Sequence, residues 1–376
     1  MATGVIFFVV LSILVLVHEL GHFMAARLFG IEVEEFAFGL PFTKPIFKIK
    51  KGKTQYGLYP LLFGGFVRLE GEEQESGRAG EYKEGSFWSR GKKQRMMVIA
   101  AGVVMNVVLA LVGFGVLYAS VGVPVRRVEL VTVVEVQKDT PADSAGIARD
   151  DRIVAVEGRP VSASEFPQLM KSWAGVEVHL LIERGKGTYL FEGIAPGPVE
   201  QKIVAIVPRA NPPEGQGSIG VLISNYPYLE TIKCSMSNVQ CLVLAAGKGV
   251  ESTVIWAGRV FDGLRSIGKS LVAGKAPEGV SGPVGIYRLV DVVAVGGFWP
   301  LLELTAILSV NLAVFNVLPI PALDGGRMIF IWWEWVRKKR VTPELERKIN
   351  SWGMAFLIGL LVLITLQDVI SGGLGK

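Results

Sequence analysis

The sequence predicts a polytopic α-helical membrane protein with four transmembrane helices, a membrane-associated β-hairpin region and one strand-rich extracytoplasmic domain. Half of the 376 residues are hydrophobic, and the mean hydropathy is +0.43. Charged residues make up 19% of the chain, compared with about a quarter in soluble domains. These values exclude a wholly soluble, disordered, collagen-like or coiled-coil chain. The net charge of +5 is too small to indicate binding to nucleic acid.

The transmembrane helices are predicted from stretches that are long and apolar enough to cross a bilayer. Lys and Arg near the ends of such helices resist translocation, and they gather after the first and third helices. We therefore expect both termini outside the cytoplasm. The first stretch has no basic start and no cleavage motif, which argues against a signal peptide. The predicted transmembrane segments are 1–29, 96–122, 298–333 and 352–370, and the cytoplasmic loops are 30–95 and 334–351.

The predicted extracytoplasmic part has two sections. Residues 125–196 alternate strand-forming runs with turn signals, a pattern typical of a small β-rich domain. Residues 197–297 contain a linker followed by an amphipathic helical pattern over 228–273. That helix is expected either to lie on the membrane surface or to cover the core of the domain. Cys234 and Cys241 would lie about 10 Å apart on one helix, so they are expected to be free thiols.

The strongest chemical signal is His18-Glu19-Leu20-Gly21-His22 in the first predicted helix. Positions four apart share one face of a helix, so both imidazoles can bind one Zn²⁺ ion while Glu19 acts on a water molecule. Ionisable groups within a membrane span persist mainly when they are paired, bound to a metal or exposed to water. The chain has three histidines, and the third, His179, lies alone in a strand-like run and is not expected to be a ligand.

A catalytic zinc site needs a third protein ligand, and no other histidine lies in a predicted span. Asp324 is the candidate, because it follows Pro319 and Pro321, which prevent a regular helix. Extended backbone at membrane depth is tolerated where it is buried in protein or lines a polar cavity. We therefore expect one Zn²⁺ ion per chain, held by His18, His22 and Asp324. A simple helix-ending turn is the alternative interpretation at Asp324.

Two motifs, His18-Glu-Leu-Gly-His22 and Asn316-x-x-Pro-x-Pro-x-Leu-Asp324-Gly, occur together in this chain. Together they resemble the site-2 protease family of intramembrane zinc metalloproteases, in its bacterial regulator-of-sigma-E protease form. The resemblance implies His18, His22 and Asp324 as zinc ligands. It also implies Glu19 as the catalytic base and Asn316 as a residue near the reacting carbonyl. Asn316 is expected to donate to a developing oxyanion or to substrate backbone, with bracing of the unwound segment as the alternative. Further similarity extends along nearly the whole chain, through Gly64–Arg68, Ala101-Gly102, Asn106 and Ser281–Ile286.

Residues 125–196 resemble an α/β PDZ domain of bacterial proteases through Asp139–Ala142, Ala145–Ile147 and Asp150–Ile153. That family usually has Gly-Asp where this chain has Asp150-Asp151, so the turn there is expected to differ. Many relatives have two PDZ domains, whereas this sequence has room for one, which indicates a single-PDZ variant. The resemblance implies that the domain either binds C-terminal peptides by strand addition or acts as a steric gate.

Residues 55–69 read as two short strands separated by turn residues. A transmembrane substrate must unwind before cleavage, and each freed backbone group costs several kcal/mol in lipid. With support from the resemblance, we expect a membrane-dipping hairpin whose edge pairs with the unwound substrate. An ordinary cytoplasmic hairpin is the alternative. The substrate-binding residues of this edge would be Gly64, Gly65, Phe66 and Val67.

The residues and the resemblance together imply a zinc endopeptidase of the bacterial inner membrane, which performs regulated intramembrane proteolysis of single-span membrane proteins. Anti-sigma factors and remnant signal peptides are substrates of such families. The expected partners are these substrates, membrane lipids and a C-terminal peptide at the PDZ domain, and no nucleic acid. One alternative is a non-catalytic membrane PDZ adaptor with a structural zinc site, which has no need of a base such as Glu19. Another is a zinc transporter, which needs polar residues along several spans.

Overall fold

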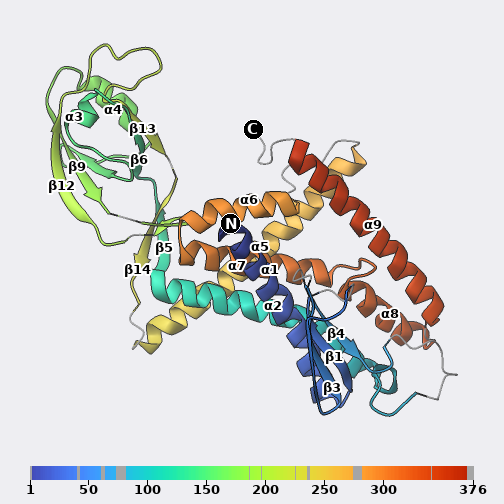
Figure 1. Cartoon of the computed structure of the whole chain (residues 1–376). Coiled ribbons are helices and arrows are strands. Elements are labelled where there is room, and N and C mark those ends of the chain that lie inside the picture. Colours follow the sequence, from blue (N-terminus) through green and yellow to red (C-terminus); the bar gives the residue numbers. More distant parts are fainter. Residues whose placement is uncertain are drawn as a thin grey trace. The chain divides into compact units, whose positions relative to one another are not determined.

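The structure is a computed structural model, in which the chain divides into two compact units (Figure 1). The first unit comprises Met1–Gly115 and Gly247–Lys376, and the second comprises Val116–Ala246. The residues that the structure describes are 2–39, 43–60, 64–72, 82–185, 187–195, 197–224, 226–234, 238–273, 282–339 and 341–370.

Helices dominate the first unit, and α2 and α5 continue into the second. The helices are α1 (Ala2–Leu28), α2 (Lys92–Val121), α5 (Val239–Val272), α6 (Pro283–Val295), α7 (Phe298–Val317), α8 (Asp324–Arg337) and α9 (Pro343–Ile370). Five helices of the described chain are long and apolar enough to cross a membrane, namely α1, α2, α5, α7 and α9. Four of them, α1, α2, α7 and α9, overlap the predicted spans. The fifth is the amphipathic α5, so the predicted count of four is not confirmed.

The predicted third span is divided by a break in the helix. Helix α7 ends at Val317, and Leu318 has the extended backbone of a C-cap. Pro319 and Pro321 follow, and proline cannot donate the backbone hydrogen bond that a continuing helix needs. Helix α8 then begins at Asp324. The prolines therefore place this aspartate at the start of a new helix.

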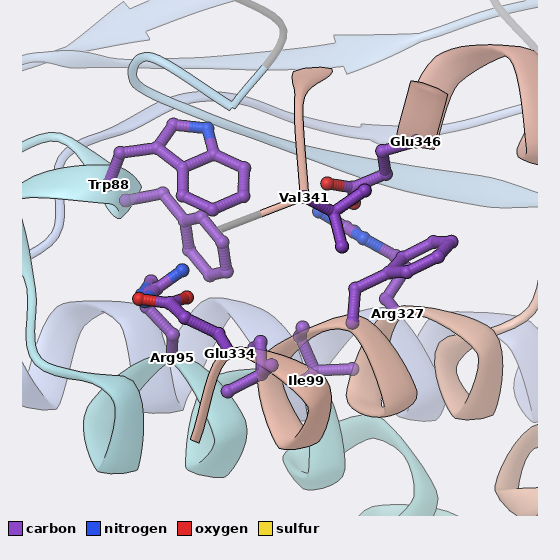
Figure 2. A pocket seen from close by; sticks show the side chains of 10 residues that line it. Trp88, Arg95, Ile99, Arg327, Glu334, Val341 and Glu346 are labelled. Carbon is purple, nitrogen blue, oxygen red and sulfur yellow. The ribbon is translucent and has the colours of Figure 1, made fainter. Parts of the chain in front are cut away.

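A buried ion pair joins α8 to α2. The Arg95 side chain on α2 is completely buried, and its Nη2 lies 2.7 Å from Oε2 of Glu334 on α8. Figure 2 shows these two side chains together, with Arg327 and Glu346 lining another part of the same pocket. Removing one partner of such a pair leaves an uncompensated buried charge, which typically destabilises a protein by about 3–5 kcal/mol. The pair therefore fixes the position of α8 on α2.

The first unit also contains a four-stranded sheet with the order β2-β3-β1-β4. Its strands are β1 (Val33–Phe38), β2 (Phe47–Lys51), β3 (Thr54–Leu58) and β4 (Gly65–Leu69). Strand β1 pairs with β3 in parallel and with β4 antiparallel, so β1 lies between the two runs that the sequence suggested as one hairpin. The predicted pairing of those runs is wrong: the hairpin is β2–β3, and β4 is an edge strand. Residues 61–63 of the predicted turn lie outside the described residues.

The second unit is rich in strands. Its core packs α3 (Pro141–Ser144) and α4 (Phe166–Ser172) against a sheet with the order β12-β9-β7-β6-β13, on which β8 pairs with β7. A second sheet has the order β10-β11-β14-β5. The larger sheet extends beyond residue 196, because β12 and β13 belong to it. The strands are β5 (Val123–Val128), β6 (Val131–Val136), β7 (Arg152–Val156), β8 (Arg159–Pro160), β9 (Val178–Arg184), β10 (Thr188–Leu190), β11 (Gly193–Ala195), β12 (Glu200–Ile206), β13 (Val221–Ser224) and β14 (Tyr228–Ile232).

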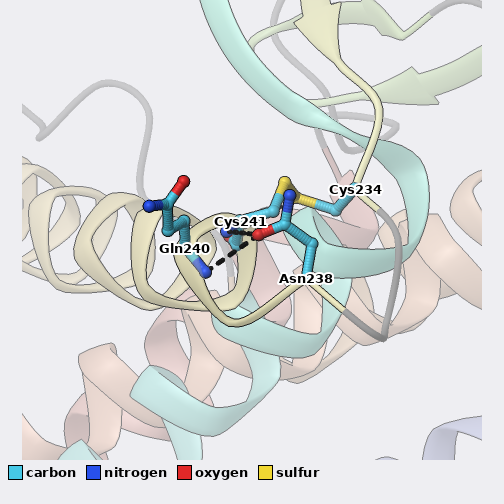
Figure 3. The surroundings of a disulfide bond; sticks show 4 residues. All are labelled: Cys234, Asn238, Gln240 and Cys241. Atoms are coloured by element: carbon cyan, nitrogen blue, oxygen red, sulfur yellow. Dashed lines mark hydrogen bonds between the residues drawn. A yellow bond between two sulfur atoms is a disulfide. The ribbon is translucent and has the colours of Figure 1, made fainter.

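Cys234 and Cys241 form a disulfide, with their Cα atoms 5.4 Å apart (Figure 3). The prediction of free thiols was therefore wrong. It assumed one continuous helix, but α5 begins only at Val239. Asn238 caps that start, because its Oδ1 accepts hydrogen bonds from the backbone N–H of Gln240 at 3.0 Å and of Cys241 at 3.3 Å. Cys234 precedes the cap and can fold back onto the first turn.

Candidate metal centre

Three side chains predicted as zinc ligands meet in the first unit. His18 and His22 lie one turn apart on α1, and Asp324 is the first residue of α8. The two Nε2 atoms are 3.2 Å apart, and Oδ2 of Asp324 lies 3.1 Å from that of His18 and 3.4 Å from that of His22. Ligands at the usual zinc distances in a tetrahedron are separated by about 3.3 Å. The triangle therefore has the size of three corners of a zinc tetrahedron.

The environment of Asp324 fits a metal better than an ordinary hydrogen bond. Its Oδ2 atom is buried and makes no hydrogen bond of acceptable geometry with any described residue, although both imidazoles are near. A buried carboxylate oxygen without a partner is unfavourable. Two imidazoles and a carboxylate form a ligand set typical of catalytic zinc, which leaves the fourth position open. The residues present therefore fit a Zn²⁺ ion.

The Nε2 atom of each imidazole faces Asp324, and its Nδ1 atom contacts a group on α2. Nδ1 of His22 lies 2.9 Å from the carbonyl oxygen of Val98 on α2, so it can donate there and leave Nε2 for the metal. Nδ1 of His18 lies 3.1 Å from Nδ2 of the fully buried Asn106, whose Oδ1 has no partner among the described residues. The oxygen and nitrogen of an asparagine amide are told apart by such contacts. Turning the Asn106 amide over exchanges its Oδ1 and Nδ2, so that Oδ1 accepts a hydrogen bond from the Nδ1–H of His18. The hydroxyl of Ser309 on α7 donates to the backbone carbonyl oxygen of Asn106 at 2.8 Å.

Glycines allow the backbones to approach this centre. A Cβ on Gly102 would lie 2.4 Å from Nε2 of His22 and 2.7 Å from Cε1 of His18. A Cβ on Gly21 would lie 2.3 Å from the carbonyl oxygen of Ala101, where α1 packs on α2. At the other ligand, a Cβ on Gly325 would lie 2.0 Å from the carbonyl oxygen of Leu318. Larger residues at these positions would separate the elements that carry the ligands.

A cavity of about 190 Å³ opens beside the three ligands. Glu19 lines it, together with Phe66 and Val67 of the edge strand β4. A Cβ on Gly65 would lie 3.5 Å from Cγ of Glu19, so β4 runs directly past this carboxylate. The volume is large enough for several water molecules, because each needs about 10–15 Å³ by this measure. The centre thus combines a metal-binding cluster, a carboxylate and space for water.

Not every predicted site residue lies in this cavity. Asn316 is 8% exposed in the last turn of α7 and is not among the residues found to line the cavity. Gly64 is buried next to β4, where its carbonyl oxygen accepts a hydrogen bond from the N–H of Gly39 at 2.7 Å. His179 lies in the second unit, where its Nδ1 is 3.1 Å from Oε1 of Glu157.

Sequence reasoning missed the residues that support the centre. Asn106 belonged to a motif, but its role depends on the packing of α2 against α1. Arg327, three residues after Asp324, lines the cavity and forms an ion pair with Glu72, three residues after the end of β4. Glu72 also accepts a hydrogen bond from the N–H of Leu69 at 3.2 Å. A basic residue one turn after a candidate ligand was the available signal for the Arg327 pair.

The centre, whose two histidines lie on a helix long and apolar enough to span a membrane, is that of a membrane-embedded zinc metalloprotease. The pattern of peptidase family M50 matches residues 6–360 of the chain. The chain therefore belongs to this family, the site-2 proteases, and it is an integral membrane zinc metalloprotease that uses Zn²⁺. These findings confirm the predicted family, enzyme class and cofactor.

Individual relatives match along nearly their whole length. A Clostridium perfringens protein described as a zinc metalloprotease is 34% identical to this chain, over 96% of each. Zinc metalloprotease RasP of Oceanobacillus iheyensis is 30% identical, over 98% of this chain and 99% of the relative. Regulator of sigma-W protease RasP of Bacillus subtilis is 28% identical, over 98% of each.

Proposed function

We propose that this protease performs regulated intramembrane proteolysis of single-span membrane proteins. The observation that carries the proposal is the cavity in which the ligand triangle, Glu19 and the edge strand β4 meet. A protease for unwound membrane helices needs both catalytic groups and a partner for freed backbone groups. Strand β4 is at the edge of the sheet that the described residues form, and it offers such a partner within reach of the carboxylate.

The residues of the chain divide the work of hydrolysis. Zinc bound by His18, His22 and Asp324 would lower the pKa of a water molecule and polarise the scissile carbonyl. Glu19 takes the proton of the attacking water and later delivers it to the leaving amine. Strand β4 aligns the substrate by backbone pairing. The buried position of Asn316 outside the cavity lining favours bracing of the α7–α8 connection over contact with substrate.

We propose that the second unit contains the single PDZ domain expected for residues 125–196. We place it outside the cytoplasm, with the loops 30–95 and 334–351 inside. The disulfide between Cys234 and Cys241 supports this side, because disulfides persist in oxidising compartments. The name of the Bacillus subtilis relative links it to regulation of a sigma factor, which supports an anti-sigma-factor-like substrate here. Cleavage assays with and without competing C-terminal peptides separate peptide binding from steric gating by the domain.

The test compares wild type with Glu19→Gln, both purified in detergent. We expect the variant to bind about one zinc per chain but to cleave a model single-span substrate about 10²–10⁴-fold more slowly, because proton transfer is lost. Glu344→Gln, at an exposed position at the start of α9, is the matched control and should cleave normally. Zinc content is measured by atomic absorption. Equal cleavage by wild type and Glu19→Gln would remove this residue from the mechanism.

A further inference from the structure

The segment between α7 and α8 contains a tight turn with an unusual residue. The N–H of Leu323 donates to the carbonyl oxygen of Ile320 at 3.2 Å, so residues 320–323 form a β-turn. Pro321 occupies its second position and Ala322 its third, with φ of +73°. This is the pattern of a type II turn, whose third position strongly favours glycine. Alanine there is held in a left-handed conformation that its Cβ disfavours.

Helix α9 supplies what holds this turn. Oδ1 of Asn350 accepts a hydrogen bond from the N–H of Ala322 at 3.2 Å. One turn further along α9, a Cβ on Gly353 would lie 2.4 Å from Cβ of Pro321 and 2.8 Å from its carbonyl oxygen. Asn350 and Gly353 share one face of the helix because they are three residues apart. The helix therefore packs its backbone on the turn, and its Asn350 accepts from the N–H of the left-handed residue itself.

The turn is coupled directly to the metal-binding carboxylate. Ala322 lies two residues before Asp324, and the N–H groups of Gly326 and Arg327 both donate to the carbonyl oxygen of Leu323, at 3.1 and 3.3 Å. A Cβ on Gly326 would lie 2.5 Å from the carbonyl oxygen of Ile320, so the turn and the first turn of α8 are in contact. A change in the conformation of Ala322 would rotate the start of α8 and the carboxylate with it.

We propose that Asn350 is a positioning residue for zinc: it holds Ala322 in its left-handed conformation and thereby keeps the Asp324 carboxylate at the two imidazoles. This inference rests on the proposed role of Asp324 as a metal ligand. Removing the acceptor releases the turn toward conformations that alanine prefers, and the ligand triangle loses one corner. Metal affinity, and not only catalysis, then depends on a residue of the last helix.

The test measures metal binding by the full chain in detergent. Zinc affinity is taken from competition with a chelator, and ligand geometry from the visible absorption of the Co²⁺-substituted protein. We expect Asn350→Ala to weaken zinc binding about 10-fold or more, as is usual for residues that orient metal ligands, and to change the Co²⁺ spectrum. Asn350→Asp keeps an acceptor oxygen and should stay within about 2-fold of wild type. Ser351→Ala, at the exposed neighbouring position, is the matched control and should behave as wild type.

A second substitution tests the conformational argument itself. Glycine adopts φ near +73° without strain, so Ala322→Gly should restore zinc affinity and the Co²⁺ spectrum in the Asn350→Ala background. Wild-type affinity in Asn350→Ala, or failure of Ala322→Gly to restore it, overturns the inference. If Asn350→Ala does not fold, the test uses Asn350→Asp instead. Weakened zinc binding by folded Asn350→Asp would then overturn the inference. Zinc affinity that is unchanged in Asp324→Ala would instead overturn the proposed ligand role, so the two failures are distinguishable.

Discussion

At the scale of single residues, the absence of a side chain is as important as the ligands themselves. Gly102 lies where α2 passes both imidazoles, and a Cβ there would be 2.4 Å from Nε2 of His22. We expect Gly102→Ala to lose zinc, because α1 and α2 must separate or an imidazole must leave its position. Zinc per chain, measured by atomic absorption after gel filtration, should fall well below one.

The control for this substitution is Gly258→Ala on α5. A Cβ at Gly258 meets no atom within 4 Å. Alanine is favoured over glycine in helices by about 0.8–1.0 kcal/mol, so this variant should keep its zinc and unfold at a slightly higher temperature. Full zinc content in Gly102→Ala would mean that the packing of α2 on the ligands is looser than the structure shows.

The phenol of Tyr189, in the strand-rich unit, should titrate at a higher pH than an ordinary tyrosine. Partial burial, and then the hydrogen bond of its hydroxyl to Oδ1 of Asp150 at 2.7 Å, raise the pKa of Tyr189 to about 12. The folded state thus holds the phenol proton more tightly than the unfolded chain, where the pKa is about 10. The resulting stabilisation is complete below pH of about 10 and is lost as the pH rises through about 12.

The measurement is a difference titration of phenolate absorbance between wild type and Tyr189→Phe. The missing component should have its midpoint near 12. Burial is the larger cause, so Asp150→Asn should lower that midpoint only in part. A component that titrates near the ordinary tyrosine pKa of about 10 would contradict the assignment.

At the scale of elements, the edge of β4 is the testable feature. Successive residues of a strand direct their N–H groups to opposite sides, so one of Phe66 and Val67 faces β1 and the other faces the open edge. Proline at the outward-facing position should leave the sheet folded and strongly slow cleavage of a helical substrate. Proline at the position that faces β1 removes a backbone hydrogen bond to that strand and should lower the melting temperature. Unchanged cleavage by both folded variants would rule out pairing at this edge.

A sequence predicts best those features whose signals are local. The clustering of the three candidate ligands was predictable because their signals are local: His18 and His22 are one helical turn apart, and two prolines precede Asp324. The order of the sheet was not, because the insertion of β1 between β3 and β4 depends on pairing between segments far apart in the chain. The disulfide was missed for a related reason. Whether Cys234 can reach Cys241 depends on where α5 begins, and the cap at Asn238 decides that.

For the whole molecule, the distribution of Lys and Arg predicts on which side of the membrane each segment lies. Five helices of the described residues have the length and composition of membrane spans, but the basic residues limit how many can cross. The segment 334–351 contains six Lys and Arg residues, which resist translocation. If α5 crossed the membrane, this segment would lie outside together with those charges. We therefore propose four crossings, with α5 lying at the outer side.

Labelling of introduced cysteines tests this arrangement. The chain has two cysteines and both form the disulfide, so wild type should not react with a membrane-impermeant maleimide. In spheroplasts, Lys50→Cys should stay unlabelled until the membrane is permeabilised. Glu177→Cys should react with the maleimide at once. Ala273→Cys, at the exposed end of α5, is the deciding position. Rapid labelling there is expected for four crossings, whereas labelling only after permeabilisation would show that α5 spans the bilayer and that the basic segment 334–351 lies outside.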